Sequence, residues 1–361
     1  MKKLVLVGGG SAHLFVLKQL QQKKLNDVEI TFISSDRYQY HSNMFPGFAE
    51  GLYSKEEIRI DLKHLADAAG VQWKEGSVLS LDPNGKVILT EQGEVLSYDV
   101  ISFNIGALTE GFNIPGVAQN SETIRPNYKA IDAIEQVRNE EKLVVVGEGL
   151  SSAELSLSLQ AWRRKQHINT PVTYIYSSHL IANKKTKTCE KIEAFVRKKG
   201  VNIKSNTKVT KVKPQSLETS TNETVPFDNL LWLTEPKAPD LFKLAKLPVD
   251  EKGFLLVEKT LQLKKYPSIF GAGDCVTINS EPIVQKNKRV SDKEGPVLYK
   301  NLVGYFNTGE GELFEPIEKR ASLLSAGDKQ GMFFFNGHVF FSRWAWYLKD
   351  KLDRSFIDKY Q

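Results

Sequence analysis

Residues 4–10 read LVLVGGG, and residues 143–149 read LVVVGEG. Each stretch is an apolar run of the kind that forms a buried parallel strand, and each breaks directly into glycines. A helical pattern over residues 11–22 and a strand pattern over residues 28–33 follow the first stretch and complete a β-α-β unit. A helical pattern and a strand pattern over residues 172–176 follow the second stretch in the same order. The repeat predicts two Rossmann-like domains, each built on a parallel sheet.

A third apolar strand pattern, over residues 268–270, runs into the sequence GAGDC. We therefore expect an α/β fold in which the chain leaves the first domain, forms the second and then returns to the first. The expected units are a first domain of residues 1–112 and 237–310, a second domain of residues 113–236, and a C-terminal α+β extension of residues 311–361.

The composition of the 361 residues is that of an ordinary soluble globular protein, with 41% hydrophobic and 25% charged residues. No apolar run is long enough to span a bilayer, and the two cysteines, Cys189 and Cys275, are far apart in the sequence. These features exclude a disulfide framework and a cysteine-built zinc site. We expect a cytoplasmic protein without a metal site.

The net charge of +6 is concentrated in residues 184–213, which hold eleven basic and two acidic residues. Nucleic-acid binding is not expected, because Phe195 is the only aromatic residue in this stretch. Three explanations stay open: solvated faces of a helix and a strand, a phosphate-bearing cofactor, or an anionic membrane surface.

Glycine turns of this kind have a steric role in dinucleotide binding. In a Gly-x-Gly-x-x-Gly turn, the first glycine makes the bend, the second lets the backbone approach a pyrophosphate, and the third allows close helix packing. Gly8 and Gly10 fill the first two positions, whereas His13 takes the third and is expected to cap the helix. Ser34 stands where a carboxylate commonly binds the ribose.

The second turn has Gly147 and Gly149 in the same roles and Ser152 at the third position. The strand that follows ends in serines at 177–178, without the carboxylate that would repel a 2′-phosphate. Because two lysines stand nearby at 184–185, this pattern favours NADPH over NADH. The alternative is a vestigial site with solvated lysines.

These features together resemble the two-dinucleotide flavoproteins of the pyridine nucleotide–disulfide oxidoreductase superfamily, over essentially the whole chain. The order of motifs is similar to that of the branch with type II NADH dehydrogenases and sulfide:quinone reductases. Several stretches resemble the NADH-dehydrogenase-like flavoproteins associated with selenide, water dikinase. They include LVGGG at 6–10, SNMFPG at 42–47, GFLLV at 253–257 and EGPVL at 294–298.

The resemblance implies FAD in the first domain and NAD(P)H in the second. Residues expected to bind FAD are Gly8, Gly10, Ser11, Ala12, Ser34, Ser35, Arg37, Val78, Asn104, Ile105, Gly106, Gly273 and Asp274. Among them, Asp274 would hold the ribityl chain of the flavin. Gly147, Gly149 and Glu154 are expected at the NAD(P), and Glu154 and Lys286 beside the flavin.

The implied activity is that of an FAD-dependent oxidoreductase that passes a hydride from NAD(P)H through the flavin to an unidentified small-molecule acceptor. A quinone is one candidate, although Arg289 and Lys293 replace two glutamines that line the quinone site of type II enzymes. Sulfide oxidation is not expected, because it needs paired cysteines. The alternative is a flavin-bound accessory protein without nicotinamide turnover, for instance in selenium metabolism. Glu235, on the nicotinamide side, favours this alternative.

A final helix is predicted over residues 342–360, with a polar side that includes Lys349 and Asp353. Its apolar stripe consists of Trp344, Leu348, Leu352 and Phe356. Such a stripe either lies on a membrane, here the inner face, or packs on its own domain or on a partner subunit, as in a homodimer.

Overall fold

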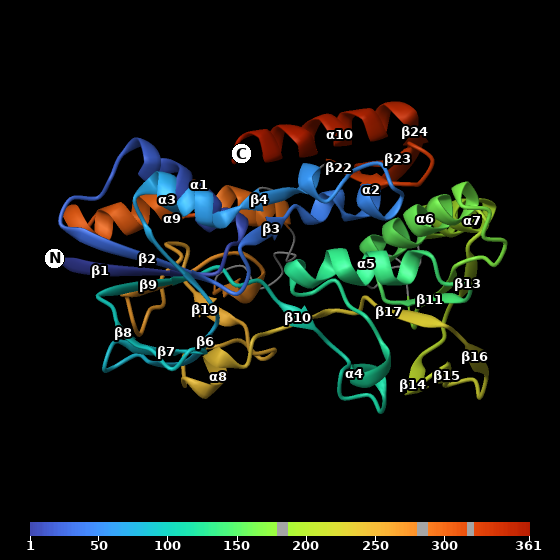
Figure 1. Ribbon diagram of the computed structural model, residues 1–361, viewed down its shortest axis with the longest axis horizontal. Coiled ribbons are helices and arrows are strands. Elements are labelled where there is room, and N and C mark those ends of the chain that lie inside the picture. Colours follow the sequence, from blue (N-terminus) through green and yellow to red (C-terminus); the bar gives the residue numbers. More distant parts are fainter. Residues whose placement is uncertain (179–186, 280–287, 316–320) are drawn as a thin grey trace.

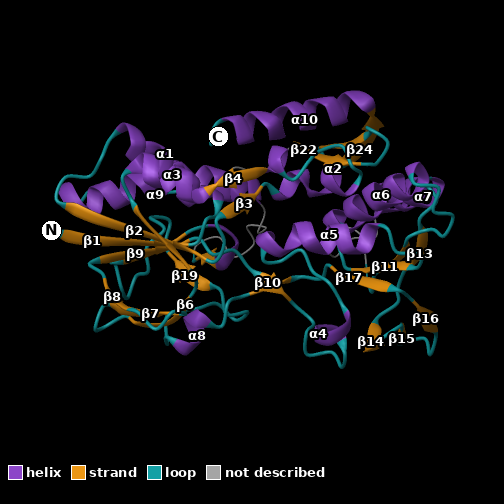
Figure 2. Ribbon diagram, viewed as in Figure 1, coloured by secondary structure: helices purple, strands orange, loops and turns teal. Residues whose placement is uncertain are grey.

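The computed structural model describes residues 1–178, 187–279, 288–315 and 321–361. It has the predicted α/β architecture, in which two parallel sheets lie side by side and helices pack against them (Figure 1, Figure 2). The two crossings between the sheets pair with each other in the middle of the molecule, as the antiparallel strands β10 (Leu108–Thr109) and β18 (Pro236–Lys237).

The first sheet has five parallel strands in the order β20-β9-β1-β2-β5. They are β1 (Lys2–Val7), β2 (Val28–Ser34), β5 (Gln72–Glu75), β9 (Val100–Phe103) and β20 (Ile269–Gly271). The predicted β-α-β unit is formed by β1, α1 (Ser11–Gln22) and β2, with Leu4 paired to Ile30. Because β20 follows the second sheet in the sequence, the chain returns to the first sheet after building the second.

The second sheet has four parallel strands in the order β13-β12-β11-β17. They are β11 (Leu143–Val146), β12 (Thr173–Ile175), β13 (Asn202–Lys204) and β17 (Asn229–Trp232). The second glycine turn joins β11 to α6 (Leu150–Lys165). Helices α5 (Ala130–Arg138) and α7 (Lys187–Lys198) belong to the same half of the molecule (Figure 1).

Shorter elements surround the two sheets. Those of the first half are β3 (Tyr38–Tyr40), α2 (Phe45–Ala49), β4 (Arg59–Asp61), α3 (Leu62–Ala69), β6 (Val78–Asp82), β7 (Val87–Thr90), β8 (Val95–Ser97), α8 (Leu241–Leu244), β19 (Leu255–Val257), β21 (Val276–Ile278) and α9 (Lys288–Asn307). Those of the second half are α4 (Val117–Asn120), β14 (Val209–Lys213), β15 (Ser216–Thr219) and β16 (Thr224–Pro226). The extension contains β22 (Ala321–Ser325), β23 (Gly331–Phe335), β24 (His338–Ser342) and α10 (Arg343–Asp358).

Helix α10 packs on the body through a different face from the one its sequence predicts. Lys349 and Asp353, predicted on its polar side, are buried, whereas Trp344 and Leu352 of the predicted apolar stripe are 61% and 51% exposed. These two charged side chains are buried because each finds a partner: Lys349 pairs with Asp353, which also binds His41.

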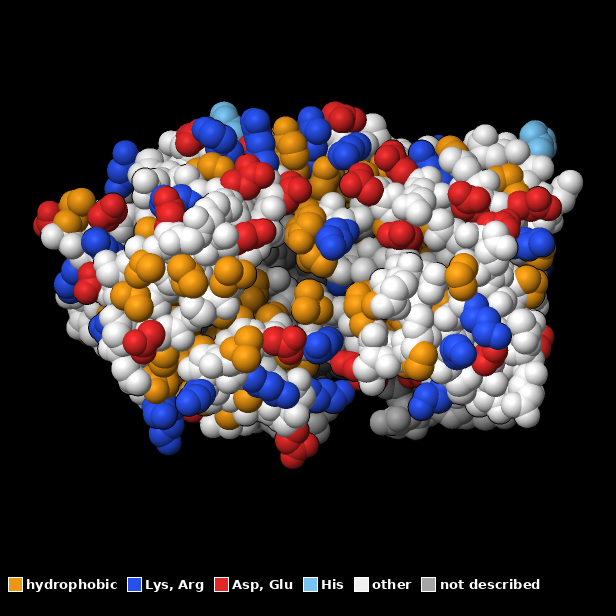
Figure 3. All heavy atoms as spheres, turned by 60° about the horizontal axis from the view of Figure 1, so that its bottom comes forward, with side chains coloured by type: hydrophobic (Ala, Val, Ile, Leu, Met, Phe, Trp, Pro, Cys, Tyr) orange, Lys and Arg blue, Asp and Glu red, His pale blue; other side chains and the backbone are white. Residues whose placement is uncertain are grey.

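Within the described part of the chain, no helix combines the length and the apolar composition that crossing a bilayer requires. Figure 3 shows one face of the molecule, which is hollowed near its middle and carries hydrophobic side chains together with both signs of charge around the hollow.

The close packing of the first glycine turn on the end of β9 leads to a stability prediction. Gly8 has a φ of +94°, and a Cβ atom there would lie 2.5 Å from the Asn104 carbonyl oxygen, whereas a Cβ at Gly93, with a φ of +82°, would meet nothing within 4 Å. Both alanine substitutions introduce left-handed strain of about 1–2 kcal/mol. Only Gly8→Ala also overpacks the turn, so we expect it to lower the free energy of unfolding by about 2 kcal/mol more than Gly93→Ala.

Urea denaturation of both variants measures this difference. Equal losses in the two variants would show that the packing of the turn against Asn104 does not limit stability.

Candidate active site

A cavity of about 610 Å³ lies at the carboxyl ends of the strands of the first sheet. Ligands of parallel α/β sheets bind at this edge, and the volume is in the usual range for ligand sites. The turns after β1, β2, β9 and β20 contribute Gly10, Ser34, Asn104 and Asp274 to the wall. Residues of α6 and β22 close the opposite side, so both domains and the C-terminal extension form the cavity.

Asn104 ties three of these turns together. Its Oδ1 accepts hydrogen bonds from the backbone N–H groups of Ala12 (3.1 Å) and His13 (3.2 Å) at the start of α1. Its Nδ2 donates to the Ala272 carbonyl oxygen (2.7 Å), and its own carbonyl oxygen accepts from Gly10 N–H (3.1 Å). One side chain therefore satisfies the helix start and fixes the segment after β20 against the glycine turn.

His13 does not cap α1, contrary to the sequence-based expectation. Its ring is fully buried behind the turn, with Nδ1 2.7 Å from the Gly8 carbonyl oxygen and Nε2 2.8 Å from Ser102 Oγ. Burial lowers the pKa of His13 to about 4, so the ring is neutral at neutral pH. A carbonyl oxygen only accepts, so Nδ1 carries the proton and Nε2 accepts from the serine hydroxyl.

Asp274 and Arg125 bring opposite charges to the wall of this cavity. Among the described residues, Oδ1 of Asp274 is buried without a hydrogen-bond partner, which is costly for a carboxylate oxygen unless a ligand supplies a donor. Arg125 donates from Nη1 to the Thr234 carbonyl oxygen (3.0 Å), and burial lowers the pKa of its guanidinium. Sequence analysis missed Arg125, because it lies in the crossing between the domains and belongs to no motif.

All of the residues predicted to bind FAD line this cavity, except Ala12 and Arg37. The Ala12 amide is used by Asn104, and the Arg37 guanidinium makes a bidentate pair with Asp61 at 2.6 Å, about half exposed. Lys286 lies outside the described residues.

Glu154 reaches the first cavity from α6. Its Oε1 accepts a hydrogen bond from the backbone N–H of Ser325 at 2.5 Å. Burial raises the pKa of Glu154 to about 7, although the positive charge of Lys349 opposes the shift. The carboxyl group therefore changes protonation state near neutral pH, which suits a group that gives and takes protons.

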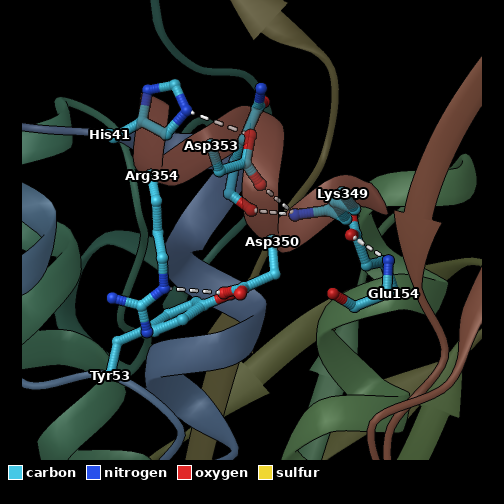
Figure 4. Close-up of polar contacts among 9 residues, drawn as sticks. His41, Tyr53, Glu154, Lys349, Asp350, Asp353 and Arg354 are labelled. Atoms are coloured by element: carbon cyan, nitrogen blue, oxygen red, sulfur yellow. Dashed lines mark hydrogen bonds and ion pairs between the residues drawn. The ribbon is translucent and has the colours of Figure 1, made fainter. Parts of the chain in front are cut away.

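A chain of polar side chains from α10 stands next to Glu154 (Figure 4). Lys349 donates from Nζ to Asp353 Oδ2 (2.7 Å) and to the Asn43 carbonyl oxygen (2.5 Å), and His41 Nε2 donates to Asp353 Oδ1 (3.2 Å). Burial would raise the pKa of Asp353, but the charge of Lys349 and the hydrogen bond from His41 hold it well below its usual range. Asp353 is therefore a permanent anion that keeps Lys349 in place.

A second cavity, of about 280 Å³, lies at the carboxyl end of the second sheet. The residues predicted to bind NAD(P) do not gather there: Gly147 lines it, Gly149 lines neither cavity, and Glu154 faces the first. A Cβ atom at Gly149 would meet nothing within 4 Å, so the turn itself is open. Glu235 also lines the second cavity, and its carboxylate pairs with Lys252 at 3.1 Å.

Comparison with known proteins gives the chain a family. The family model described as pyridine nucleotide-disulphide oxidoreductase matches residues 2–300. The chain belongs to this family. Among the curated relatives of this oxidoreductase, the NADH dehydrogenase-like protein YutJ of Bacillus subtilis is 23% identical over 308 residues, covering 84% of this chain and 85% of the relative. The external NADH-ubiquinone oxidoreductase 2 of Saccharomyces cerevisiae mitochondria is 26% identical over 345 residues, covering 83% and 62%.

Two solved structures share the fold along nearly the whole oxidoreductase. The sulfide:quinone oxidoreductase of Aquifex aeolicus has a TM-score of 0.80 at 20% identity and covers 99% of this chain and 92% of its own. The NDH2 of Plasmodium falciparum in complex with NADH has a TM-score of 0.83 at 14% identity and covers 99% and 97%. The predicted superfamily and fold class are confirmed, and the family implies FAD and NAD(P)H.

The raised pKa of Glu154 makes stability depend on pH. A carboxyl group with a pKa of about 7 in the folded protein and about 4.3 when unfolded stabilises the fold fully below pH 4.3, and this contribution is lost as the pH rises through 7. Between pH 5 and 8 we expect the free energy of unfolding of the wild type to fall by about 2–3 kcal/mol more than that of Glu154→Gln. The glutamine keeps an acceptor for the Ser325 N–H but does not titrate.

Urea denaturation at several pH values checks this, with Glu135→Gln on the exposed side of α5 as the control. If all three proteins follow parallel pH profiles, Glu154 is not held protonated in the folded state.

Proposed function

We propose that this protein is an FAD-dependent NAD(P)H dehydrogenase that delivers electrons to a small-molecule acceptor of the quinone class. The observation that carries the proposal is the first cavity, which the glycine turn after β1 lines together with Asp274, whose buried Oδ1 has no hydrogen-bond partner among the described residues. Support for the acceptor class comes from the relatives, two of which are named for ubiquinone and for quinone.

The residues of the first cavity fit the parts of FAD. The turn after β1, with Gly8, Gly10 and the Ser11 hydroxyl, would face the pyrophosphate, and Ser34 with Ser35 would face the adenosine ribose. Among the described residues of the wall, Asp274 and Arg125 are two of the four with a carboxyl or guanidinium side chain, the others being Asp36 and Glu154. The Asp274 carboxylate would accept from ribityl hydroxyl groups, and the Arg125 guanidinium would balance negative charge. Bound there, FAD would supply the two-electron chemistry between NAD(P)H and the acceptor.

Glu154 is the residue that we assign to proton handling. Reducing a quinone-class acceptor to its hydroquinone requires two protons with two electrons. Glu154 Oε lies on the cavity wall with a pKa of about 7 and beside Lys349, so it is protonated in a substantial fraction of molecules at neutral pH.

Chemistry based on a pair of sulfurs is not part of this proposal. Cys275 is buried after β20 and Cys189 is buried on α7, so the two cysteines lie in different halves of the protein. The acceptor is therefore proposed to be reduced without a disulfide relay.

A peripheral contact with the inner face of a membrane is proposed for the C-terminal extension. Large apolar side chains of β23, β24 and α10 are exposed there: Phe335, Phe340, Trp344, Tyr347 and Leu352. Aromatic side chains of this kind favour the lipid headgroup region. Co-sedimentation with anionic liposomes would support the contact, whereas a concentration-dependent dimer in solution would assign the same surface to a second copy.

A second candidate function is a flavin-bound accessory protein without nicotinamide turnover, including one in selenium metabolism. It is favoured by three glutamates that line the second cavity, Glu110, Glu148 and Glu235. Their negative charge opposes the binding of a dinucleotide pyrophosphate.

Mixing the purified protein with NADH or NADPH under anaerobic conditions separates the two candidates. Bleaching of the visible flavin absorbance by either nucleotide is expected for the dehydrogenase. A flavin that stays oxidised with both nucleotides would contradict the dehydrogenase and support the accessory protein. A colourless preparation that takes up no FAD would contradict both candidates.

Asp274→Ala tests the flavin site itself. Losing hydrogen bonds to a charged group is expected to weaken FAD binding about 10–100-fold, measured as the flavin-to-protein ratio after dialysis. Asp67→Ala removes an exposed carboxylate on α3 and is the control, with an unchanged ratio expected. Equal flavin content in both variants would remove Asp274 from the FAD site.

A further inference from the structure

The end of β12 is the place where the second cavity would meet an adenosine ribose. In dinucleotide-binding sheets, a carboxylate just after this strand accepts hydrogen bonds from the ribose hydroxyl groups. Here β12 ends at Ile175, and Ser177 and Ser178 follow it. The sequence alone therefore shows no carboxylate at this position that would discriminate against a 2′-phosphate.

In the structure, a carboxylate from a different element lies at the end of β12. Glu148, the middle residue of the turn after β11, accepts hydrogen bonds from the hydroxyl groups of Ser177 and, at 3.2 Å, of Ser178. The backbone N–H of Gly147 donates to the Ile175 carbonyl oxygen at 3.1 Å, which holds the turn against the end of β12. Glu148 and Ser177 both line the second cavity.

We propose that Glu148 makes the second cavity selective for NADH over NADPH. The inference rests on the proposed function, namely that a nicotinamide dinucleotide binds in this cavity. The carboxylate would accept from the two neighbouring ribose hydroxyl groups of NADH, and it would repel the 2′-phosphate of NADPH. The two serine hydroxyl groups orient the carboxylate and replace part of its hydration.

The position of Glu148 leaves room for the pyrophosphate. Its carboxylate is held over the end of β12 by the serines, rather than at the start of α6. At that start, a Cβ atom on Gly149 would meet nothing within 4 Å, so the helix N-terminus stays accessible to phosphate oxygens.

Other charges around the cavity give the matched controls. Glu235 lines the same cavity but pairs with Lys252, so Glu235→Gln removes an equal charge without touching the serine-held position. Lys208 also lines the cavity and is, among the described lining residues, the cation that would favour a 2′-phosphate. Lys208→Gln therefore tests whether this cation, rather than Glu148, sets the preference between NAD⁺ and NADP⁺.

The test measures binding of NAD⁺ and NADP⁺ to the flavin-loaded protein by titration calorimetry, which needs no turnover. The wild type is expected to bind NAD⁺ at least about tenfold more tightly than NADP⁺, since hydrogen bonds to a charged group differ by this order. Glu148→Gln is expected to weaken NAD⁺ and strengthen NADP⁺, so that the ratio falls to about two or less. Glu235→Gln and Lys208→Gln are expected to keep the wild-type order.

The double variant Ser177→Ala/Ser178→Ala keeps the Glu148 carboxylate but removes the two hydroxyl groups that hold it. We expect this variant to bind NAD⁺ more weakly and NADP⁺ no more tightly than the wild type. Unchanged flavin absorbance and melting temperature show that each variant is folded. The inference is overturned if the wild type prefers NADP⁺, or if the ratio in Glu148→Gln equals that in Glu235→Gln. In either case the proposed function stands, because a dinucleotide binds. Binding of neither dinucleotide, together with a flavin that neither NADH nor NADPH bleaches, overturns the proposed function and this inference with it.

Discussion

The hydrogen bonds of the Asn104 side chain are the constraint on which the first cavity depends. They hold the start of α1 with one atom and the segment after β20 with another, across more than 150 residues of sequence. This explains why two glycines precede the helix: Cβ atoms at Gly8 and Gly10 would lie 2.5 Å or less from Asn104 atoms. The turn is therefore small because protein packs behind it, and its open side remains for a ligand.

The C-terminal extension is part of this site and not an appendage. Residues of β22 line the first cavity, and the Ser325 amide binds Glu154, while Lys349 and Asp353 of α10 stand beside it. Buried charges are tolerated here because each has a partner of opposite charge or a hydrogen-bond donor. The same arrangement leaves Trp344 and Leu352 of the apolar stripe exposed, whereas Phe356 stacks on the His41 ring.

The two cavities are lined by similar sets of charged residues, and the places of these charges organise the proposed chemistry. Asp36, Glu154, Asp274 and Arg125 line the first, and Glu110, Glu148, Glu235 and Lys208 line the second. In the first, the Asp274 carboxylate would accept hydrogen bonds from the hydroxyl groups of the proposed cofactor, and the Arg125 guanidinium would balance its negative charge. In the second, the proposed selectivity rests on Glu148, which the hydroxyl groups of Ser177 and Ser178 hold at the end of β12, where its charge would repel a 2′-phosphate. The summed negative charge of the same glutamates supports the accessory-protein alternative, so only a measurement of dinucleotide binding separates the candidate functions.

The sequence by itself determined the two glycine turns and the β-α-β order, because these depend on strand and helix patterns within about 35 residues of each other. Its motifs also indicated the superfamily and eleven of the residues that line the first cavity. It did not determine which face of α10 is buried, nor the placement of Arg125 and Glu148. Each of these depends on partners supplied by a distant segment: His41 for α10, the Thr234 carbonyl for Arg125, and the serines after β12 for Glu148. Only the tertiary structure decides them, because the cost of burying a charge is set by the groups that meet it in space.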